Sequence, residues 1–271
     1  MSAAPGINYR MPRVSGLRPG ILHRSGDLTA FTADEAGSLV AGHGLASVLD
    51  LRSDSEVARY GPPSGLLAHG VRWLRTPLTG YPRDTIAARR PGIADRTRYL
   101  HGILTEATPG SWPLLFRELA GSADRPFLLS CHFGKDRTGV VVAAVLALAG
   151  APPHEIAADY AAGMSDLVAK ADRFRDKWLR RGHTREEYLS RLRTSPVTMA
   201  RWLNEVMDRH HSIQDALLAL DVAADDLAQV RGLLTAPSPA PAPAPTSTPT
   251  PTAPARPGPP TGTGDVPEGR R

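Results

Sequence analysis

Residues 128–146 read LLSCHFGKDRTGVVVAAVL, and this stretch decides how the chain folds. It opens with apolar residues that end at Cys131, turns through polar residues around Gly134, and then becomes apolar again. A short apolar run followed by a longer one is typical of a buried strand and a buried helix. We therefore predict a strand over 126–131, a tight turn that uses the freedom of glycine, and a helix over 138–149.

The alternation of strands and helices continues on the N-terminal side of this stretch. Short apolar runs predict further strands over 20–26, 45–52 and 71–78. Thr32 and Glu35 have the spacing of a capping box, which predicts a helix that ends near Gly44. Strands that alternate with helices predict an α/β fold, with a central sheet flanked by helices.

From residue 154 onward the pattern is helical, so the sheet is followed by a helical C-terminal part. The predicted helices cover 169–181, 184–193, 195–211 and 212–234. Ser195, followed by Pro196, and Ser212 have the residue types that cap the last two. Their apolar spacing predicts that these last helices pack on the core.

The composition changes abruptly at residue 236. Residues 236–271 are rich in proline, alanine and threonine and carry almost no large aliphatic side chains. Such a segment cannot bury enough apolar surface to offset its ordering entropy, so we expect a disordered, solvated tail. A ligand for a proline-recognising partner is the functional alternative for it. Residues 7–235 remain as one folded domain.

The overall composition is that of a mildly basic globular protein. Lys and Arg number 32 against 27 Asp and Glu, and lysine occurs only at 135, 170 and 177. Cys131 is the only cysteine, so the chain can form no internal disulfide, which is typical of a reducing compartment. The N-terminus has no apolar signal core, and the run 139–151 is shorter than the ~20 residues of a membrane span. We therefore expect a cytoplasmic protein without a membrane span.

Cys131 stands where the predicted strand gives way to the turn that leads into a helix. Main-chain N–H groups at such a turn form a cradle for an anion, and the helix dipole reinforces it. The same field favours the thiolate form of a cysteine. Arg137, six positions further along, can return over the cradle and hold two phosphate oxygens. A nucleophile and an anion clamp thus meet at one phosphorus atom.

The pattern Cys-x5-Arg-Thr resembles the loop of the cysteine-dependent phosphatases. GKDRTG (134–139) is similar to the loop of a bacterial tyrosine-protein phosphatase family related to dual-specificity and phosphoinositide phosphatases. Flanking stretches that look like this family are PGILHRSGDL (19–28), LASVLDLRSDSE (45–56) and SPVTMARWLNEV (195–206). The resemblance implies a phosphatase-like catalytic domain over 7–235 that hydrolyses phosphomonoesters without a metal or cofactor. Its expected partner is a phosphotyrosine-containing protein or a phosphoinositide.

The resemblance also implies a role for each residue of the loop. Cys131 would attack phosphorus and form a cysteinyl-phosphate, while Arg137 holds the equatorial oxygens in the transition state. Thr138 would donate a hydrogen bond to the sulfur. Many relatives supply the general acid from a separate Trp-Pro-Asp loop, but no acid follows the Trp-Pro pair at 112–113 here. The resemblance points instead to Asp136 as the general acid and later base. The expected substrate contacts are His132, Phe133, Gly134, Lys135 and Gly139, with Lys135 at the mouth attracting acidic substrates.

Ser130 departs from the family pattern, which has histidine directly before the cysteine. A hydroxyl brings no imidazole network to activate the thiol. A catalytically weak or inactive phosphate-binding module of the same fold therefore remains the alternative function. A sulfur-transfer enzyme also places a cysteine in an anion-cradling loop, although the Arg-Thr-Gly that follows here argues against it.

Several charged residues outside the loop are expected to have structural rather than catalytic roles. Asp50 and Arg52 are expected to anchor neighbouring loops by ion pairs, and His23 and Arg24 to cap or form salt bridges. The His210–His211 pair is interpreted as the cationic end of a helix rather than a metal site. The arginine-rich segment 83–98, which contains Asp84 and Asp95 as weaker candidates for the acid, is expected to be a mobile cover. It lacks the aromatics of a nucleic-acid surface.

Overall fold

The computed structural model describes residues 6–80, 92–122, 124–180 and 182–235. Within these ranges, five strands form one sheet in the order β1-β2-β5-β3-β4. The strands are β1 (Ile7–Arg10), β2 (Leu22–Gly26), β3 (Ser47–Asp50), β4 (Arg72–Arg75) and β5 (Phe127–Ser130). Strands β2, β5, β3 and β4 are parallel, and β1 pairs antiparallel with β2. The strand that leads into Cys131 is therefore the middle strand of the sheet.

Helices occupy most of the remaining described residues. Those before β5 are the 3₁₀ helix η1 (Leu28–Ala30), α1 (Ala33–His43), α2 (Asp54–Tyr60), α3 (Ser64–Leu67), α4 (Ile93–Thr105) and α5 (Ser111–Ala120). Those after β5 are α6 (Asp136–Leu148), α7 (Pro153–Ala162), α8 (Met164–Ala169), the 3₁₀ helix η2 (Ala171–Phe174), α9 (Arg175–Leu179), α10 (Arg185–Leu192), α11 (Pro196–His210), α12 (Ile213–Leu218) and α13 (Ala224–Thr235).

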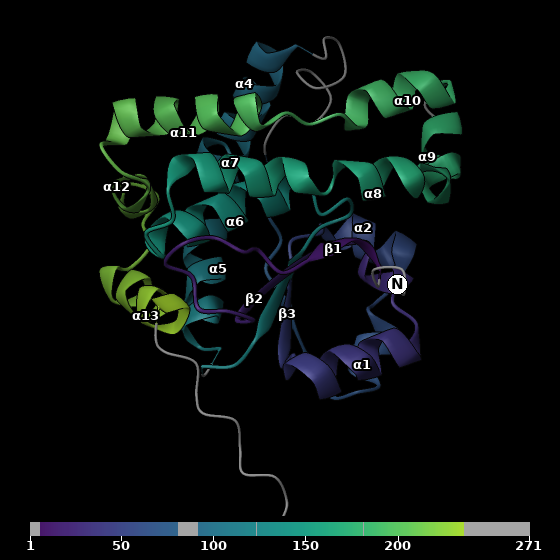
Figure 1. Ribbon diagram of the computed structural model, residues 1–271, viewed down its shortest axis with the longest axis horizontal. Coiled ribbons are helices and arrows are strands. Elements are labelled where there is room, and N and C mark those ends of the chain that lie inside the picture. The colour runs from purple at the N-terminus through teal and green to yellow at the C-terminus, as the bar shows by residue number, and fades with distance from the viewer. Residues whose placement is uncertain (1–5, 81–91, 123, 181, 236–271) are drawn as a thin grey trace, which may run out of the picture. The chain divides into compact units, whose positions relative to one another are not determined.

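The two faces of the sheet build two separate cores. Side chains alternate across a strand, so Phe127 and Leu129 of β5 face the larger core and Leu128 faces the smaller one. The larger core is covered by α4–α7 and α11–α13, and the smaller one by α1 and α3. Figure 1 shows α1 on one side of the strands and α5 and α13 on the other.

A third apolar cluster joins β1, near the start of the chain, to the helices α8–α10. It contains Ile7 of β1 together with Phe174, Trp178 and Tyr188, and the side chain of Phe133 packs against it. Because Phe133 belongs to the stretch between β5 and α6, this helical segment is packed directly on the loop that follows Cys131.

The structure confirms the predicted strands near 20–26, 45–52, 71–78 and 126–131, each as a shorter strand. The predicted capping box of α1 is present, with Thr32 accepting from the Glu35 N–H and Gly44 closing the helix in a left-handed conformation. Ser195 and Ser212 cap α11 and α12 as predicted. The buried helix predicted from residue 138 begins two residues earlier, at Asp136. The edge strand β1 and the helices α2, α3, α4 and α5 were not predicted.

Two predicted helices were wrong in detail. The segment 212–234 is broken into α12 and α13, because Asp221 adopts a left-handed conformation with φ 62° between them. The described part of the segment 169–181 begins at the last residue of α8 and continues through the 3₁₀ helix η2 into α9. In a 3₁₀ helix residues i and i+3 eclipse, so Ala171 and Phe174 both face the third cluster.

The arginine-rich segment 83–98 was expected to be a mobile cover, and its described part is a helix instead. Residues 93–98 form the first turns of α4, where Arg96 donates to the carbonyl groups of Ser190 and Arg191 at 2.9 and 3.1 Å. Asp84 and the tail 236–271 lie outside the described residues.

The described part of the chain contains no helix that is both long and apolar enough to cross a membrane.

Candidate active site

Cys131 directly follows β5 at the carboxyl end of the parallel strands, where ligands bind in open α/β sheets. The residue is buried, with 3% of its surface exposed. The chain then turns through residues 132–135 and enters α6 at Asp136. The elements therefore place the thiol at the N-terminal end of a buried helix, as the sequence predicted.

The carbonyl groups of the loop are held from outside the turn. Asn8 Nδ2 donates to the carbonyl oxygens of Phe133 at 3.0 Å and Gly134 at 2.8 Å, and Arg24 Nη2 donates to Gly134 at 3.0 Å. In a planar trans peptide the C=O and the next N–H point in opposite directions. The N–H groups of Gly134 and Lys135 therefore face away from Asn8 and Arg24, which is the arrangement of an anion cradle.

Glycine is required at the centre of this turn. Gly134 has φ +60°, and a Cβ there would lie 2.4 Å from the backbone of Ser25 and Gly26. A Cβ on Gly26 would in turn meet the backbone of Phe133 at 2.5 Å. The loop thus lies directly against the end of β2, and any side chain at Gly134 would push it away.

Arg137 is held in one orientation by a carboxylate from α2. Its Nη1 and Nη2 atoms donate to Glu56 Oε2 and Oε1, both at 2.7 Å, and Nη1 also donates to the Leu51 carbonyl at 2.9 Å. Leu51 N–H donates to Ser130 O at 2.8 Å, which ties the end of β3 to the residue before Cys131. The guanidinium is therefore fixed relative to the thiol through the ends of two neighbouring strands.

Glu56 was missed as a site residue by the sequence analysis. It lies at the third position of α2, where its carboxylate accepts from Ser53 N–H and completes a capping box. The spacing Ser53-x-x-Glu56 repeats the Thr32-x-x-Glu35 pattern that marked α1. The sequence thus contained a signal for the helix, but none for the contact with Arg137.

We expect Glu56→Gln to lower kcat of phosphate ester hydrolysis about tenfold to a hundredfold, because the amide nitrogen would oppose a guanidinium N–H and misplace Arg137. Glutamine keeps the capping box, but the buried Arg137 loses its charged partner, so the melting temperature should fall as well. Steady-state kinetics with an aryl phosphate measures the effect. Glu35→Gln makes the same change in the capping box of α1 and should leave kcat unaltered; equal rates for the two variants would contradict the role of Glu56.

Asp136 is the first residue of α6 and is bound by a buried tyrosine. Tyr160 OH donates to Asp136 Oδ1 at 3.0 Å, and burial together with the adjacent Asp136 raises the pKa of Tyr160 well above its ordinary value. The ring of Tyr160 lies where a Cβ on Gly139 would meet it at 2.7 Å, so glycine at 139 makes room for this contact. The Asp136 side chain is 23% exposed, against 8% for Arg137, which gives the carboxylate access to solvent.

Lys135 does not line an open mouth. It is buried, and its Nζ donates to the carbonyl oxygens of Arg191 at 3.1 Å and Leu192 at 3.3 Å, at the end of α10. Burial lowers the pKa of Lys135, while Asp136, 3.6 Å away, opposes this shift. The ammonium group therefore joins the loop to α10, instead of facing acidic substrates at an open mouth as expected.

The remaining predicted site residues lie in or beside the loop. Thr138 is fully buried, and its Oγ1 forms no hydrogen bond within the described structure, so its predicted bond to the sulfur is not seen. Ser130 Oγ donates to the Cys131 carbonyl at 3.2 Å. The His132 ring is buried and stacks on Tyr60, with 4.5 Å between the ring centres.

The charged residues outside the loop support the strand ends. Asp50 and Arg52 form a fully buried ion pair at 2.8 Å, as predicted. Arg24 pairs with Asp159, which also accepts from Arg10. Burial alone would raise the pKa of Asp159, but the two arginines lower this pKa below its ordinary value. Of the weaker acid candidates, Asp95 lies in the first turn of α4.

This geometry agrees with the sequence relationship of the chain. Residues 8–236 match the tyrosine phosphatase family. The chain belongs to the tyrosine phosphatase family. The match begins within β1 and runs past the end of α13, so it spans the strands, the loop and the helices that pack on it.

Two phosphatases are similar to part of this chain. A triple specificity protein phosphatase, PtpB, of Mycobacterium tuberculosis is 33% identical over 172 residues, which cover 54% of this chain and 62% of that protein. A tyrosine-protein phosphatase of Nostoc commune is 28% identical over 162 residues, which cover 58% of this chain and 54% of that protein. This chain therefore spans less than two thirds of the length of either relative.

Two solved structures are also similar. The core catalytic domain of the PP-IP phosphatase SIW14 from S. cerevisiae is 18% identical, with coverage of 60% of this chain and 78% of that chain and a TM-score of 0.33. A putative phosphatase from Neisseria meningitidis is 22% identical, with coverage of 62% and 96% and the same TM-score. Because both TM-scores are low, the family assignment rests on the sequence match.

Proposed function

We propose that this protein is a cysteine-dependent phosphomonoester hydrolase that works through a cysteinyl-phosphate intermediate. Cys131 is the nucleophile, and the loop N–H groups with Arg137 bind the phosphoryl oxygens. Asp136 protonates the leaving group and then activates water, and Thr138 stabilises the sulfur as it leaves. The substrate is a phosphotyrosine-containing protein or a phosphoinositide, and the protein acts in a reducing cytoplasm.

The observation that carries this proposal is the fixed pairing of thiol and guanidinium. A lone cysteine at the end of the middle strand faces a helix N-terminus, and the arginine six residues later is oriented by two 2.7 Å bonds to Glu56. Because the guanidinium is already oriented, little free energy is needed to reorganise it when charge develops on the phosphoryl group. This is the arrangement that phosphoryl transfer to a cysteine requires.

The test is to trap the intermediate on the wild-type protein. Incubation with a phosphotyrosine peptide labelled on phosphorus, followed by rapid denaturation, should leave a label on Cys131 that mass spectrometry locates. Continuous hydrolysis of an aryl phosphate should accompany it. If neither label nor hydrolysis above the uncatalysed rate is found, the proposed function fails.

A phosphate-binding module without turnover is the second candidate, and Ser130 favours it. The serine hydroxyl is engaged with the Cys131 carbonyl and supplies no imidazole near the thiol. The rate of alkylation of Cys131 as a function of pH separates the two functions, because a catalytic thiolate stays reactive below neutral pH, whereas the rate for an ordinary thiol falls steadily below a pH of about 8.5.

We expect Asp136→Asn to lower kcat about a hundredfold with phenyl phosphate and only a few-fold with a nitro-activated aryl phosphate, because a good leaving group needs no proton. The measurement is kcat across a series of leaving groups. Asp95→Asn is the matched control, since Asp95 is also a first-turn carboxylate and is 25% exposed. Equal losses of Asp136→Asn with all leaving groups would show a structural role for Asp136 instead.

A further inference from the structure

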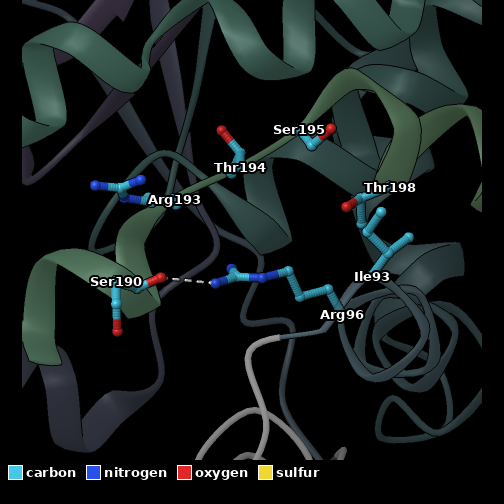
Figure 2. A pocket seen from close by; sticks show the side chains of 7 residues that line it. All are labelled: Ile93, Arg96, Ser190, Arg193, Thr194, Ser195 and Thr198. Atoms are coloured by element: carbon cyan, nitrogen blue, oxygen red, sulfur yellow. Dashed lines mark hydrogen bonds between the residues drawn. The ribbon is translucent and has the colours of Figure 1, made fainter.

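A pocket of about 430 Å³ lies between the first turn of α4, the end of α10 and the first turn of α11. Figure 2 shows it from close by, with Ile93 and Arg96 on α4 and Thr198 on α11. Arg193 and Thr194, between α10 and α11, complete this wall. The residues that line the pocket include none of the loop residues 131–139, so it is separate from the site at Cys131.

Thr198 supplies the first sign of a ligand in this pocket. The residue is 1% exposed, and its Oγ1 forms no hydrogen bond within the described part of the chain. Its backbone N–H is already used, because it donates to the Ser195 carbonyl at 3.0 Å. A buried hydroxyl without a partner is costly and rare. Figure 2 shows this hydroxyl on the side of α11 that faces the pocket.

The charges around the pocket are positive. Arg96 and Arg193 are the charged residues among the described residues that line it, and none of these described residues is a carboxylate. Both α4, of 13 residues, and α11, of 15 residues, begin there, so two positive helix ends meet at the pocket. The first turn of α11 contains no acidic residue but is capped by Ser195, and the first turn of α4 contains Asp95 but has no side-chain cap at Gly92. A buried donor beside two arginines is suited to an anion with several oxygens.

We propose that this pocket binds a phosphate group, with Thr198 Oγ1 as a hydrogen-bond donor and Arg96 and Arg193 as its charged partners. The phosphate comes either from a second position of a multiply phosphorylated substrate or from free phosphate. The inference rests on the proposed function only for the choice of phosphate as the anion.

The pocket is joined to the catalytic loop through one carbonyl group. Arg96 Nη1 and Lys135 Nζ each donate to the Arg191 carbonyl at 3.1 Å. An anion that draws Arg96 toward the pocket would therefore change the environment of Lys135, beside Asp136. Binding at the pocket is thus connected to the site at Cys131 by contacts that the structure contains.

Binding is tested with inorganic phosphate, measured by calorimetry and by thermal unfolding against sodium chloride of equal ionic strength. Wild type should bind two phosphates. Thr198→Val should weaken one of them about tenfold, because a hydrogen bond to a charged group is lost. The constant with which phosphate inhibits aryl phosphate hydrolysis should change much less, because the pocket reaches the catalytic loop only indirectly, through the Arg191 carbonyl. Without phosphate this variant should unfold at an equal or higher temperature, since an unpartnered buried hydroxyl is removed.

Thr105→Val, on α4 but outside the pocket, is the matched control and should bind phosphate as wild type does. Arg193→Gln should weaken the same phosphate as Thr198→Val. A single phosphate site in wild type, with an identical isotherm for Thr198→Val, would overturn the inference. If the protein hydrolyses no phosphate ester but retains binding that depends on Thr198, the proposed function fails and the pocket stands.

The source of the phosphate follows from kcat/KM for a soluble inositol bisphosphate relative to a monophosphate. If Thr198→Val removes a preference for the bisphosphate, the pocket holds the second phosphate of a substrate. If the ratio stays unchanged while inorganic phosphate binds through Thr198, the pocket takes free phosphate. Either result supports the proposal, and the absence of both contradicts it.

Discussion

Replacing Cys131 by serine will lower the rate of aryl phosphate hydrolysis by at least about four orders of magnitude, because the loss of a covalent nucleophile removes the main route of the reaction. A serine hydroxyl is a much weaker nucleophile than a cysteine sulfur, and the site is buried, so water has little room to take the place of the sulfur. Single-turnover and steady-state rates with the same aryl phosphate give the measurement.

Two controls accompany the Cys131→Ser variant. Phosphate affinity should be retained, because the cradle is built from main-chain groups and Arg137, and this retention separates lost chemistry from lost folding. Ser130→Ala changes the adjacent residue, whose hydroxyl contacts only a carbonyl group in the described structure, and should alter the rate a few-fold at most. A Cys131→Ser rate within tenfold of wild type would refute the covalent mechanism.

Replacing Arg137 by lysine should lower kcat about a thousandfold, the loss expected when a preorganised donor to the developing charge is removed. Arg137 reaches Glu56 with two nitrogens and the Leu51 carbonyl as well, and a lysine ammonium has no planar fork to do this. It would also leave Glu56, 13% exposed, with a poorer partner, so the melting temperature should fall.

The comparison for Arg137→Lys is Arg201→Lys. Arg201 forms an exposed i,i+4 ion pair with Glu205 at 2.7 Å, and the same substitution there should affect neither kcat nor stability by much. A rise in KM with unchanged kcat for Arg137→Lys would show that the guanidinium binds ground state and transition state equally, and would contradict its proposed role.

The sequence was most informative where structure is local. The apolar run before Cys131 and the run after it set the strand and the helix, and Gly134 marked a left-handed turn that the φ of +60° confirms. The caps at Thr32, Ser195 and Ser212 were likewise predicted from residues only a few positions apart. Local hydrogen bonds depend on spacing along the chain, which a sequence states directly.

The contacts that hold the site together were not predictable in this way. Asn8 reaches Gly134 across 126 residues and Glu56 reaches Arg137 across 81, and no pattern of spacing encodes either contact. Lys135 was placed at an open mouth because the end of α10 could not be located from the sequence. Tertiary packing decides which polar side chains meet, and these contacts orient the catalytic loop and Arg137.

Asn8 links the catalytic loop to the first strand of the chain. It lies on β1, four residues long, which among the described strands pairs only with β2, and its own N–H is held by Asp166 at 2.5 Å. Terminal edge strands are where local opening costs least free energy. When β1 opens, Phe133 and Gly134 lose the side chain that turns their carbonyl groups outward. Arg24 still holds the Gly134 carbonyl, but Phe133 loses its contact with Asn8, so the anion cradle keeps its full support only while β1 stays closed, although the core around α6 is independent of that strand.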